Sequence, residues 1–199
     1  DPHKRYAAVV TALDRAIGRV LDALDKTGQA NNTFVFFMSD NGGFRLNRKG
    51  IDIGINDPLR SGGVTCWEGG IRVVAMAKWP GKIKPGSVVD EAFWSPDIMQ
   101  ACAKLSGARL PSDVVFDGKD PLPLLFDGAK SKHESFFFTF RRHAALRMGD
   151  WKIVRERPER PWQLFDLAKD ISESTNLAKS EPEKLKALSG EFERWRKTF

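Results

Sequence analysis

The chain has 199 residues, of which 41% are hydrophobic and 29% are charged, a composition typical of a folded domain with a sizeable core. The formal net charge is +6 at pH 7, but the lysines and arginines are spread out and no nucleic-acid-binding motif accompanies them. Cys66 and Cys102 are too few for a disulfide scaffold and lack the spacing of a metal site, and no apolar run is long enough to span a membrane.

Three elements are predicted in the first eighty residues. Apolar residues at helical spacing predict a helix over 7–26, with Gly28 as its stop. The segment Thr33–Met38 has strand composition without polar alternation, so it is expected to be a strand covered on both faces. A second buried strand is predicted over 71–79.

The first of these strands ends in Ser39, Asp40 and Asn41, followed by two glycines. In open α/β sheets, ligands bind beyond the carboxyl ends of strands, and carboxylate and amide oxygens suit Ca²⁺ or Mg²⁺. The glycines allow the backbone to turn sharply and to approach a ligand closely. The alternative is a simple turn closing the strand, because Asn-Gly steps are common in turns. These residues by themselves leave both interpretations open.

A second helix is predicted after Ser95, which is a plausible N-cap with Pro96 at the first helical position and Gly107 at the end. Residues 108–132 contain several prolines and Asp-Gly steps and are expected to be mostly loop.

The last third is predicted to be β-rich, with a closing helix. The Met148-Gly149-Asp150-Trp151 sequence favours a hairpin. The predicted strands and final helix cover residues 135–140, 144–148, 151–155, 162–167 and 182–195.

Several motifs, in a fixed order along nearly the whole chain, resemble the formylglycine-dependent sulfatases of the arylsulfatase type, within the alkaline phosphatase superfamily. They lie at residues 6–21, 39–43, 58–73 (PLRSGGVTCWEGGIRV), 79–81 (WPG), 145–154 (ALRMGDWKIV), 164–167 (LFDL) and 176–178 (NLA), with Asp170 and Glu173 between the last two.

The resemblance and the predicted elements together imply an α/β fold. Residues 1–132 are expected to form part of a mixed, mostly parallel sheet flanked by helices, the C-terminal portion of the sulfatase core. Residues 133–199 are expected to form a small C-terminal α+β subdomain with an antiparallel sheet and the closing helix.

The resemblance also implies a chemistry. In this family, a cysteine in a Cys-x-Pro-Ser-Arg motif becomes the formylglycine nucleophile, and one Ca²⁺ is held by an early Asp-Asp pair and a later Asp-Asn pair. Asp40 and Asn41 match the later pair, whereas neither cysteine stands in the nucleophile motif and no Asp-Asp pair is present. The formylglycine is therefore expected upstream of residue 1. The chain is interpreted as the C-terminal part of a larger protein, and the isolated chain is predicted to be inactive.

Two positions bear on the type of reaction. Asn41 favours one Ca²⁺, because phosphohydrolases of the superfamily that hold two metals usually have Asp-His here. The family lysine that contacts the sulfate corresponds to Gly63, which is a departure from the pattern. Arg60, Arg48 or Lys49 could substitute for that cation. If the cation is lost, Gly63→Lys is expected to raise turnover.

The remaining polar candidates are interpreted as structural. His3, His133 and His143 cannot be matched to the family's catalytic histidines and are expected to be surface residues, although His143 could line a substrate cleft. Trp67 and Glu68 are expected to serve packing rather than catalysis.

The first functional hypothesis is a sulfuric ester hydrolase, and the alternatives are a metal-dependent phosphohydrolase of the same superfamily or a non-catalytic, degenerate homologue. The expected partners are the N-terminal part of the same protein and a sulfate ester, with a sulfated glycan as one option, and neither a nucleic acid nor a membrane span is expected. The resemblance implies a periplasmic or secreted location.

Overall fold

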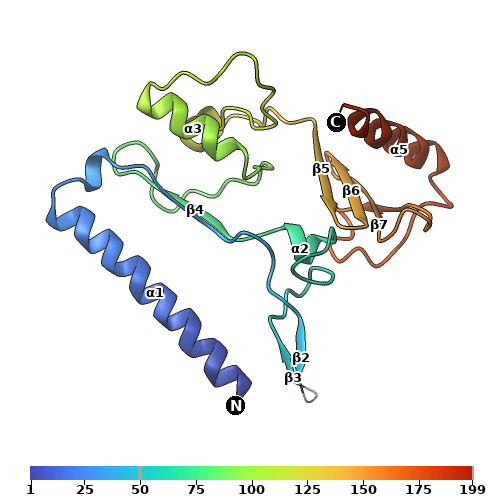
Figure 1. Cartoon of the computed structure of the whole chain (residues 1–199), viewed down its shortest axis with the longest axis horizontal. Helices are drawn as coiled ribbons and strands as arrows, with labels where there is room; N and C mark the ends of the chain where they lie inside the picture. The colour runs from blue at the N-terminus through green and yellow to red at the C-terminus, as the bar shows by residue number, and fades with distance from the viewer. Residues whose placement is uncertain (49–50, 199) are drawn as a thin grey trace.

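The computed structural model describes residues 1–48 and 51–198. Figure 1 shows a long helix, α1, at one side of the molecule and a sheet covered by the last helix, α5, at the other. The elements are α1 (Pro2–Lys26), η1 (Ala30–Asn32), β1 (Val35–Met38), β2 (Leu46–Arg48), β3 (Ile51–Ile53), α2 (Glu68–Ile71), β4 (Ala75–Lys78), α3 (Asp97–Ser106), α4 (Leu122–Asp127), β5 (Ser135–Phe140), β6 (His143–Met148), β7 (Trp151–Arg155), β8 (Gln163–Asp166) and α5 (Pro182–Arg196).

Helix α1 confirms the predicted helix and extends it toward the N-terminus. The Asp1 side chain accepts a hydrogen bond from the His3 backbone N–H at 2.9 Å, and Pro2 occupies a first-turn position where no N–H is needed. None of its residues is buried, and apolar side chains such as Val9 (68% exposed) and Val20 (60% exposed) face outward. The apolar stripe that predicted this helix is therefore largely uncovered in the described structure.

Strand β1 follows the predicted position but differs from the expected environment. It pairs antiparallel with β4, from Val35 opposite Lys78 to Met38 opposite Ala75. All strand pairs among residues 1–48 and 51–198 are antiparallel, and β1 is half-buried rather than covered on both faces. The α/β class is confirmed, but the mostly parallel pairing expected for residues 1–132 is not found among the described strands, where β1 pairs antiparallel with β4.

The segment predicted as one strand over 71–79 is divided into two elements. The short helix α2 takes Glu68–Ile71, and only 75–78 form strand β4. Backbone bonds from Gly70 N to Trp67 O (2.8 Å) and from Arg72 N to Glu68 O (2.8 Å) close the helical turn. The prediction failed at its start because the Gly69-Gly70 pair turns the chain before it extends.

The middle of the chain holds one predicted and one unpredicted helix. Helix α3 runs from Asp97 to Ser106 with Gly107 as its C-cap, but Pro96 rather than Ser95 occupies the N-cap position. Within the stretch predicted to be loop, α4 forms because Pro121 and Pro123 sit at its start, where proline is tolerated, and Leu122 and Leu124 become buried.

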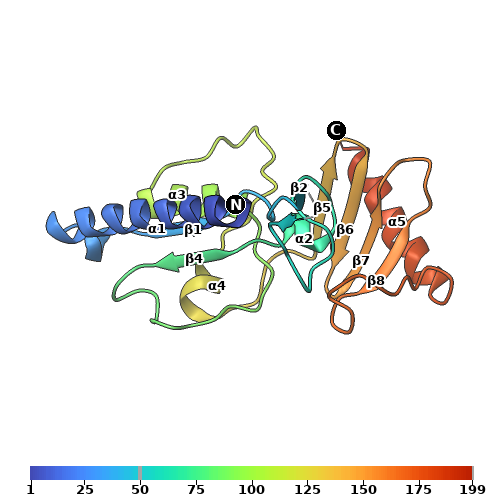
Figure 2. The same cartoon turned by 90° about the horizontal axis from the view of Figure 1, so that it is seen from below.

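The C-terminal elements confirm the predicted sheet and closing helix. The strand order is β5-β6-β7-β8, all antiparallel, and Met148 pairs with Trp151 across the expected hairpin. One face of this sheet packs against Leu188 and Phe192 of α5. The other face packs against Cys66 and Trp67, which lie just before α2. Figure 2 shows the resulting layers, with the sheet between α5 and the α2 region.

Candidate functional site

Asp40 and Asn41 lie side by side immediately beyond the carboxyl end of β1, as the sequence predicted. Ser39 still follows the strand direction, since its N–H donates to Val74 O at 3.1 Å. The Asn41 N–H donates to Asp40 Oδ1 at 2.9 Å, and Ser39 Oγ donates to Asn41 O at 2.9 Å. These are the local bonds of a turn, and they leave Asp40 exposed and Asn41 half-buried. The turn interpretation is therefore met by these bonds, and the ligand interpretation stays a prediction.

The pair lines an open cleft of about 750 Å³. Thr65, Glu68 and Arg72 contribute to the wall around α2, and residues 89–95 and 136–140 form other parts of the lining. The cleft thus brings Asp40 and Asn41 together with the Gly-rich segment 60–72 and strand β5, which come from distant parts of the sequence.

The glycines around the pair permit close contact between backbones. Gly42 N–H donates to Gly70 O at 3.0 Å, and a Cβ atom on Gly42 would overlap the carbonyl oxygen of Gly69. A Cβ atom on Gly63 would lie 2.5 Å from Gly42 O and 2.7 Å from Asn41 Oδ1. Position 63 therefore does face Asn41 of the candidate ligand pair, but the space that a side chain would need is already occupied.

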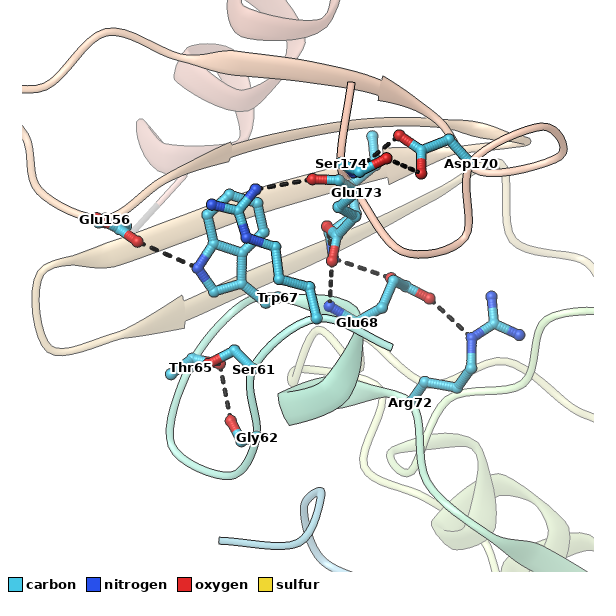
Figure 3. Close-up of polar contacts among 12 residues, drawn as sticks. Ser61, Gly62, Thr65, Trp67, Glu68, Arg72, Glu156, Asp170, Glu173 and Ser174 are labelled. Atoms are coloured by element: carbon cyan, nitrogen blue, oxygen red, sulfur yellow. Dashed lines mark hydrogen bonds and ion pairs between the residues drawn. The ribbon is translucent and has the colours of Figure 1, made fainter. Parts of the chain in front are cut away.

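A buried charge cluster, formed by Glu68, Lys152 and Glu173, lies behind this loop (Figure 3 draws both glutamates). Lys152 Nζ donates to Glu68 Oε1 at 2.9 Å and lies 2.8 Å from Glu173 Oε1, a charge contact without hydrogen-bond alignment. The Glu68 N–H donates to Glu173 Oε2 at 2.7 Å, and Arg72 Nε donates to Glu68 Oε2 at 2.8 Å. The cluster joins α2, β7 and the loop after β8.

The pKa values of the two buried glutamates shift in opposite directions. Burial raises the pKa of Glu68, but the charges and hydrogen bonds of Lys152 and Arg72 outweigh it, so the net shift is downward. Burial dominates at Glu173 and raises its pKa despite the nearby Lys152. Glu68 and Trp67 are both buried, which fits the packing role predicted from the sequence, and Glu68 also lines the cleft. The sequence analysis did not predict the buried contact between Lys152 and Glu173. A lysine within the apolar strand 151–154 could have indicated a buried charge.

Arg60, a candidate sulfate contact, is engaged in packing. Its guanidinium lies 3.7 Å from the centre of the Trp67 ring, and its terminal NH1 donates to Glu173 O at 2.7 Å. Of the other two candidates, Lys49 lies outside the described residues, and the Arg48 side chain is likewise not described.

The cysteines and histidines have distinct environments. Cys66 is buried, and burial raises its pKa to about 11, so the thiol stays neutral and packs in the core. The surface prediction is confirmed for His3 and wrong for His133, whose side chain is 5% exposed and whose Nε2 lies 2.7 Å from Asp97 Oδ1. That carboxylate and the Trp94 and Phe136 rings hold the imidazole in place.

His143 is half-buried at the start of β6, with a buried Nδ1 that lacks a hydrogen-bond partner in the described structure. His143 is therefore only partly exposed, and it lies in a strand rather than in the expected loop. The residue does not contribute to the lining of the cleft that contains Asp40 and Asn41.

The donor chemistry of Asp40 and Asn41 fits part of a calcium site. A carboxylate and an amide oxygen are hard ligands, but Ca²⁺ takes about six to eight of them. Among residues 1–48 and 51–198, no group of three or more His, Cys, Asp or Glu side chains is arranged to hold a metal ion. The pair would therefore need ligands from elsewhere.

A pH-dependent prediction concerns the loop that carries Glu173. Partial burial raises the pKa of Asp170, but hydrogen bonds from Thr175 N, Ser172 Oγ and Ser174 lower it from 3.8 to about 2. A lowered carboxyl pKa contributes stability that is present above 3.8 and is lost as the pH falls toward 2.

Asp170→Asn is therefore expected to lower the free energy of unfolding by about 1 kcal/mol near neutral pH, with the difference vanishing at the acidic end of that window. Urea unfolding as a function of pH measures it, with Asp14→Asn on exposed α1 as the control. A difference in the free energy of unfolding that persists unchanged at the acidic end would contradict the lowered pKa of Asp170.

Comparison with known proteins supports the resemblance seen in the sequence. The sulfatase family profile matches residues 1–108, and the profile of the N-sulphoglucosamine sulphohydrolase C-terminal region matches residues 65–197. The chain is 41% identical over 144 residues to steryl-sulfatase of Rattus norvegicus, covering 69% of this chain and 24% of that protein. It is 32% identical to N-acetylgalactosamine-6-sulfatase of Mus musculus, covering 87% and 33%.

The structural comparison agrees. A crystal structure of Ps i-CgsB in complex with k-i-k-neocarrahexaose superposes with a TM-score of 0.84 at 33% identity, covering 96% of this chain and 42% of that one. The chain therefore spans about a quarter to two fifths of the length of these relatives. No helix of the described residues is long and apolar enough to cross a bilayer. With a family profile over more than half of its residues and this structural match, the chain belongs to the sulfatase family of the alkaline phosphatase superfamily.

Proposed function

We propose that the full-length protein hydrolyses sulfate esters with a formylglycine nucleophile and one Ca²⁺, and that this chain supplies Asp40 and Asn41 to the metal. The observation that carries the proposal is the position of this pair, beyond β1 and on the wall of the cleft, in a chain of the sulfatase family. Bound Ca²⁺ would polarise the sulfate oxygens. The role of this chain is to hold two oxygen ligands next to the segment 60–72.

The nucleophile and the other metal ligands belong, in this proposal, to an N-terminal part of the same protein. The exposed apolar face of α1, with Val9 and Val20, is a surface on which that part could pack. The relatives differ in their named substrates, a steryl sulfate and N-acetylgalactosamine 6-sulfate. We propose a sulfated glycan as the substrate class, because the superposed structure holds an oligosaccharide. A periplasmic or secreted location completes the proposal.

The alternatives make different predictions for the same assay. A phosphohydrolase of the superfamily would prefer a phosphate ester over the matching sulfate ester. A degenerate homologue would turn over neither. Asn41 favours the sulfatase, because its amide oxygen suits Ca²⁺ whereas zinc sites favour imidazole.

The test is hydrolysis of a chromogenic aryl sulfate by the full-length, formylglycine-modified protein. Asp40→Ala and Asn41→Ala are each expected to lower kcat/KM by roughly two to three orders of magnitude, because each removes a ligand of the cation that stabilises developing charge. Asp90→Ala, a carboxylate elsewhere in the same cleft, serves as the matched control. The 199-residue chain alone should show no turnover.

Two results would overturn the proposal. Faster hydrolysis of the aryl phosphate than of the aryl sulfate would favour the phosphohydrolase. Equal activity of wild type, Asp40→Ala and Asn41→Ala would show that the pair does not serve the reaction.

A further inference from the structure

The Asn56 carboxamide binds three backbone segments at once. Its Oδ1 accepts the Gly43 N–H at 3.0 Å. Its Nδ2 donates its two hydrogens to Gly43 O at 2.8 Å and Ser61 O at 3.1 Å, and Gly54 O lies at 3.3 Å as a shared acceptor. Only one orientation of the amide satisfies these contacts, because the nitrogen faces three carbonyls and the oxygen faces an N–H.

These contacts fix the backbone that immediately follows Asn41. Strand β1 ends at Met38, so the Gly42–Gly43 peptide lies beyond the sheet ladder. Gly42 N–H donates to Gly70 O, and Gly43 O accepts from Gly63 N–H at 3.0 Å as well as from Asn56. Asn56 is the side chain that binds both the N–H and the carbonyl of Gly43, and it therefore sets the direction in which the chain leaves the Asp40–Asn41 pair.

We propose that Asn56 is a positioning residue that holds Asp40 and Asn41 in the geometry needed to ligate a divalent cation. This inference rests on the proposed function, which identifies the cation as Ca²⁺. To bind both the N–H and the carbonyl of Gly43, the side chain at position 56 must carry a hydrogen-bond acceptor and a donor and have the length of asparagine. Aspartate has the same shape but no donor, and it would set a carboxylate against three carbonyl oxygens.

The experiment measures Ca²⁺ binding to the full-length protein by isothermal titration calorimetry. Asn56→Asp and Asn56→Ala are expected to weaken Ca²⁺ affinity by roughly 10- to 100-fold, the usual effect of removing a group that orients metal ligands. Saturating Ca²⁺ should restore part of the lost turnover, a rescue that a purely structural defect would not show. Circular dichroism in EDTA checks that both variants fold.

The matched control is Asn176→Asp. Asn176 Oδ1 accepts the N–H groups of Leu164 and Ala178 at 3.0 Å each, and a carboxylate preserves both bonds. This control carries the same chemical change and should bind Ca²⁺ as the wild type does.

The outcomes separate the two proposals. Unchanged Ca²⁺ affinity in both Asn56 variants, beside a wild type that binds Ca²⁺, overturns the role of Asn56 alone. A wild type that binds no Ca²⁺ overturns the metal assignment of Asp40 and Asn41 and this inference with it. Failure of both variants to fold in EDTA assigns Asn56 to folding and also overturns the inference.

Discussion

Replacing Lys152 with methionine should destabilise the protein by about 3–5 kcal/mol, because it leaves a buried carboxylate without its cation. Lys152 is fully buried, between Glu68 and Glu173, and methionine has a similar length without the charge. Arg72 still pairs with Glu68 in this variant, so Glu173 is the carboxylate left uncompensated. Denaturant unfolding monitored by circular dichroism gives the free energy of unfolding.

Two further variants sharpen this prediction. Adding Glu173→Gln to Lys152→Met should recover part of the loss, since it removes the uncompensated charge. Lys169→Met is the exposed control, because Lys169 pairs with Asp166 at 3.0 Å with its side chain 84% exposed, and it should cost at most about 1 kcal/mol. Equal effects of Lys152→Met and Lys169→Met would contradict the importance of the buried cluster.

Gly63→Lys should lower both Ca²⁺ affinity and turnover, the opposite of what the resemblance suggested. The Cβ atom of any side chain at this position would meet Gly42 O, a backbone atom that cannot rotate away, and Asn41 Oδ1. Overpacking of this kind costs about 1–3 kcal/mol, and here the strain falls on a candidate metal ligand. Calorimetric titration with Ca²⁺ and the aryl sulfate assay measure the two effects in the full-length protein.

Gly63→Ala separates the steric effect from the charge, because alanine adds the Cβ atom alone. It should reproduce most of the loss. Gly18→Lys adds the same charge on α1, where nothing lies within 4 Å of a new Cβ atom, and should leave both measurements unchanged. Turnover of Gly63→Lys above that of the wild type would refute the steric argument and restore the original expectation.

The sequence alone determined the features that depend on residues close together in the sequence. Helical spacing located α1 and α5, and the Gly149-Asp150 step located the hairpin between β6 and β7. The placement of Asp40 and Asn41 beyond β1 also followed from local pattern, since an apolar run ended in polar residues and glycines. Periodicity and turn chemistry act over a few residues, so a single sequence is enough to read them.

Contacts between distant residues were decided only by the tertiary structure. Lys152 meets a glutamate 84 positions away, and Glu173 binds the backbone of that glutamate from 105 positions away. Neither pairing has a local signature. The burial of His133 against Asp97 and the stacking of Arg60 on Trp67 were missed for the same reason. Polar side chains such as these resemble surface residues in the sequence, and only the approach of other segments supplies the partners that make their burial favourable.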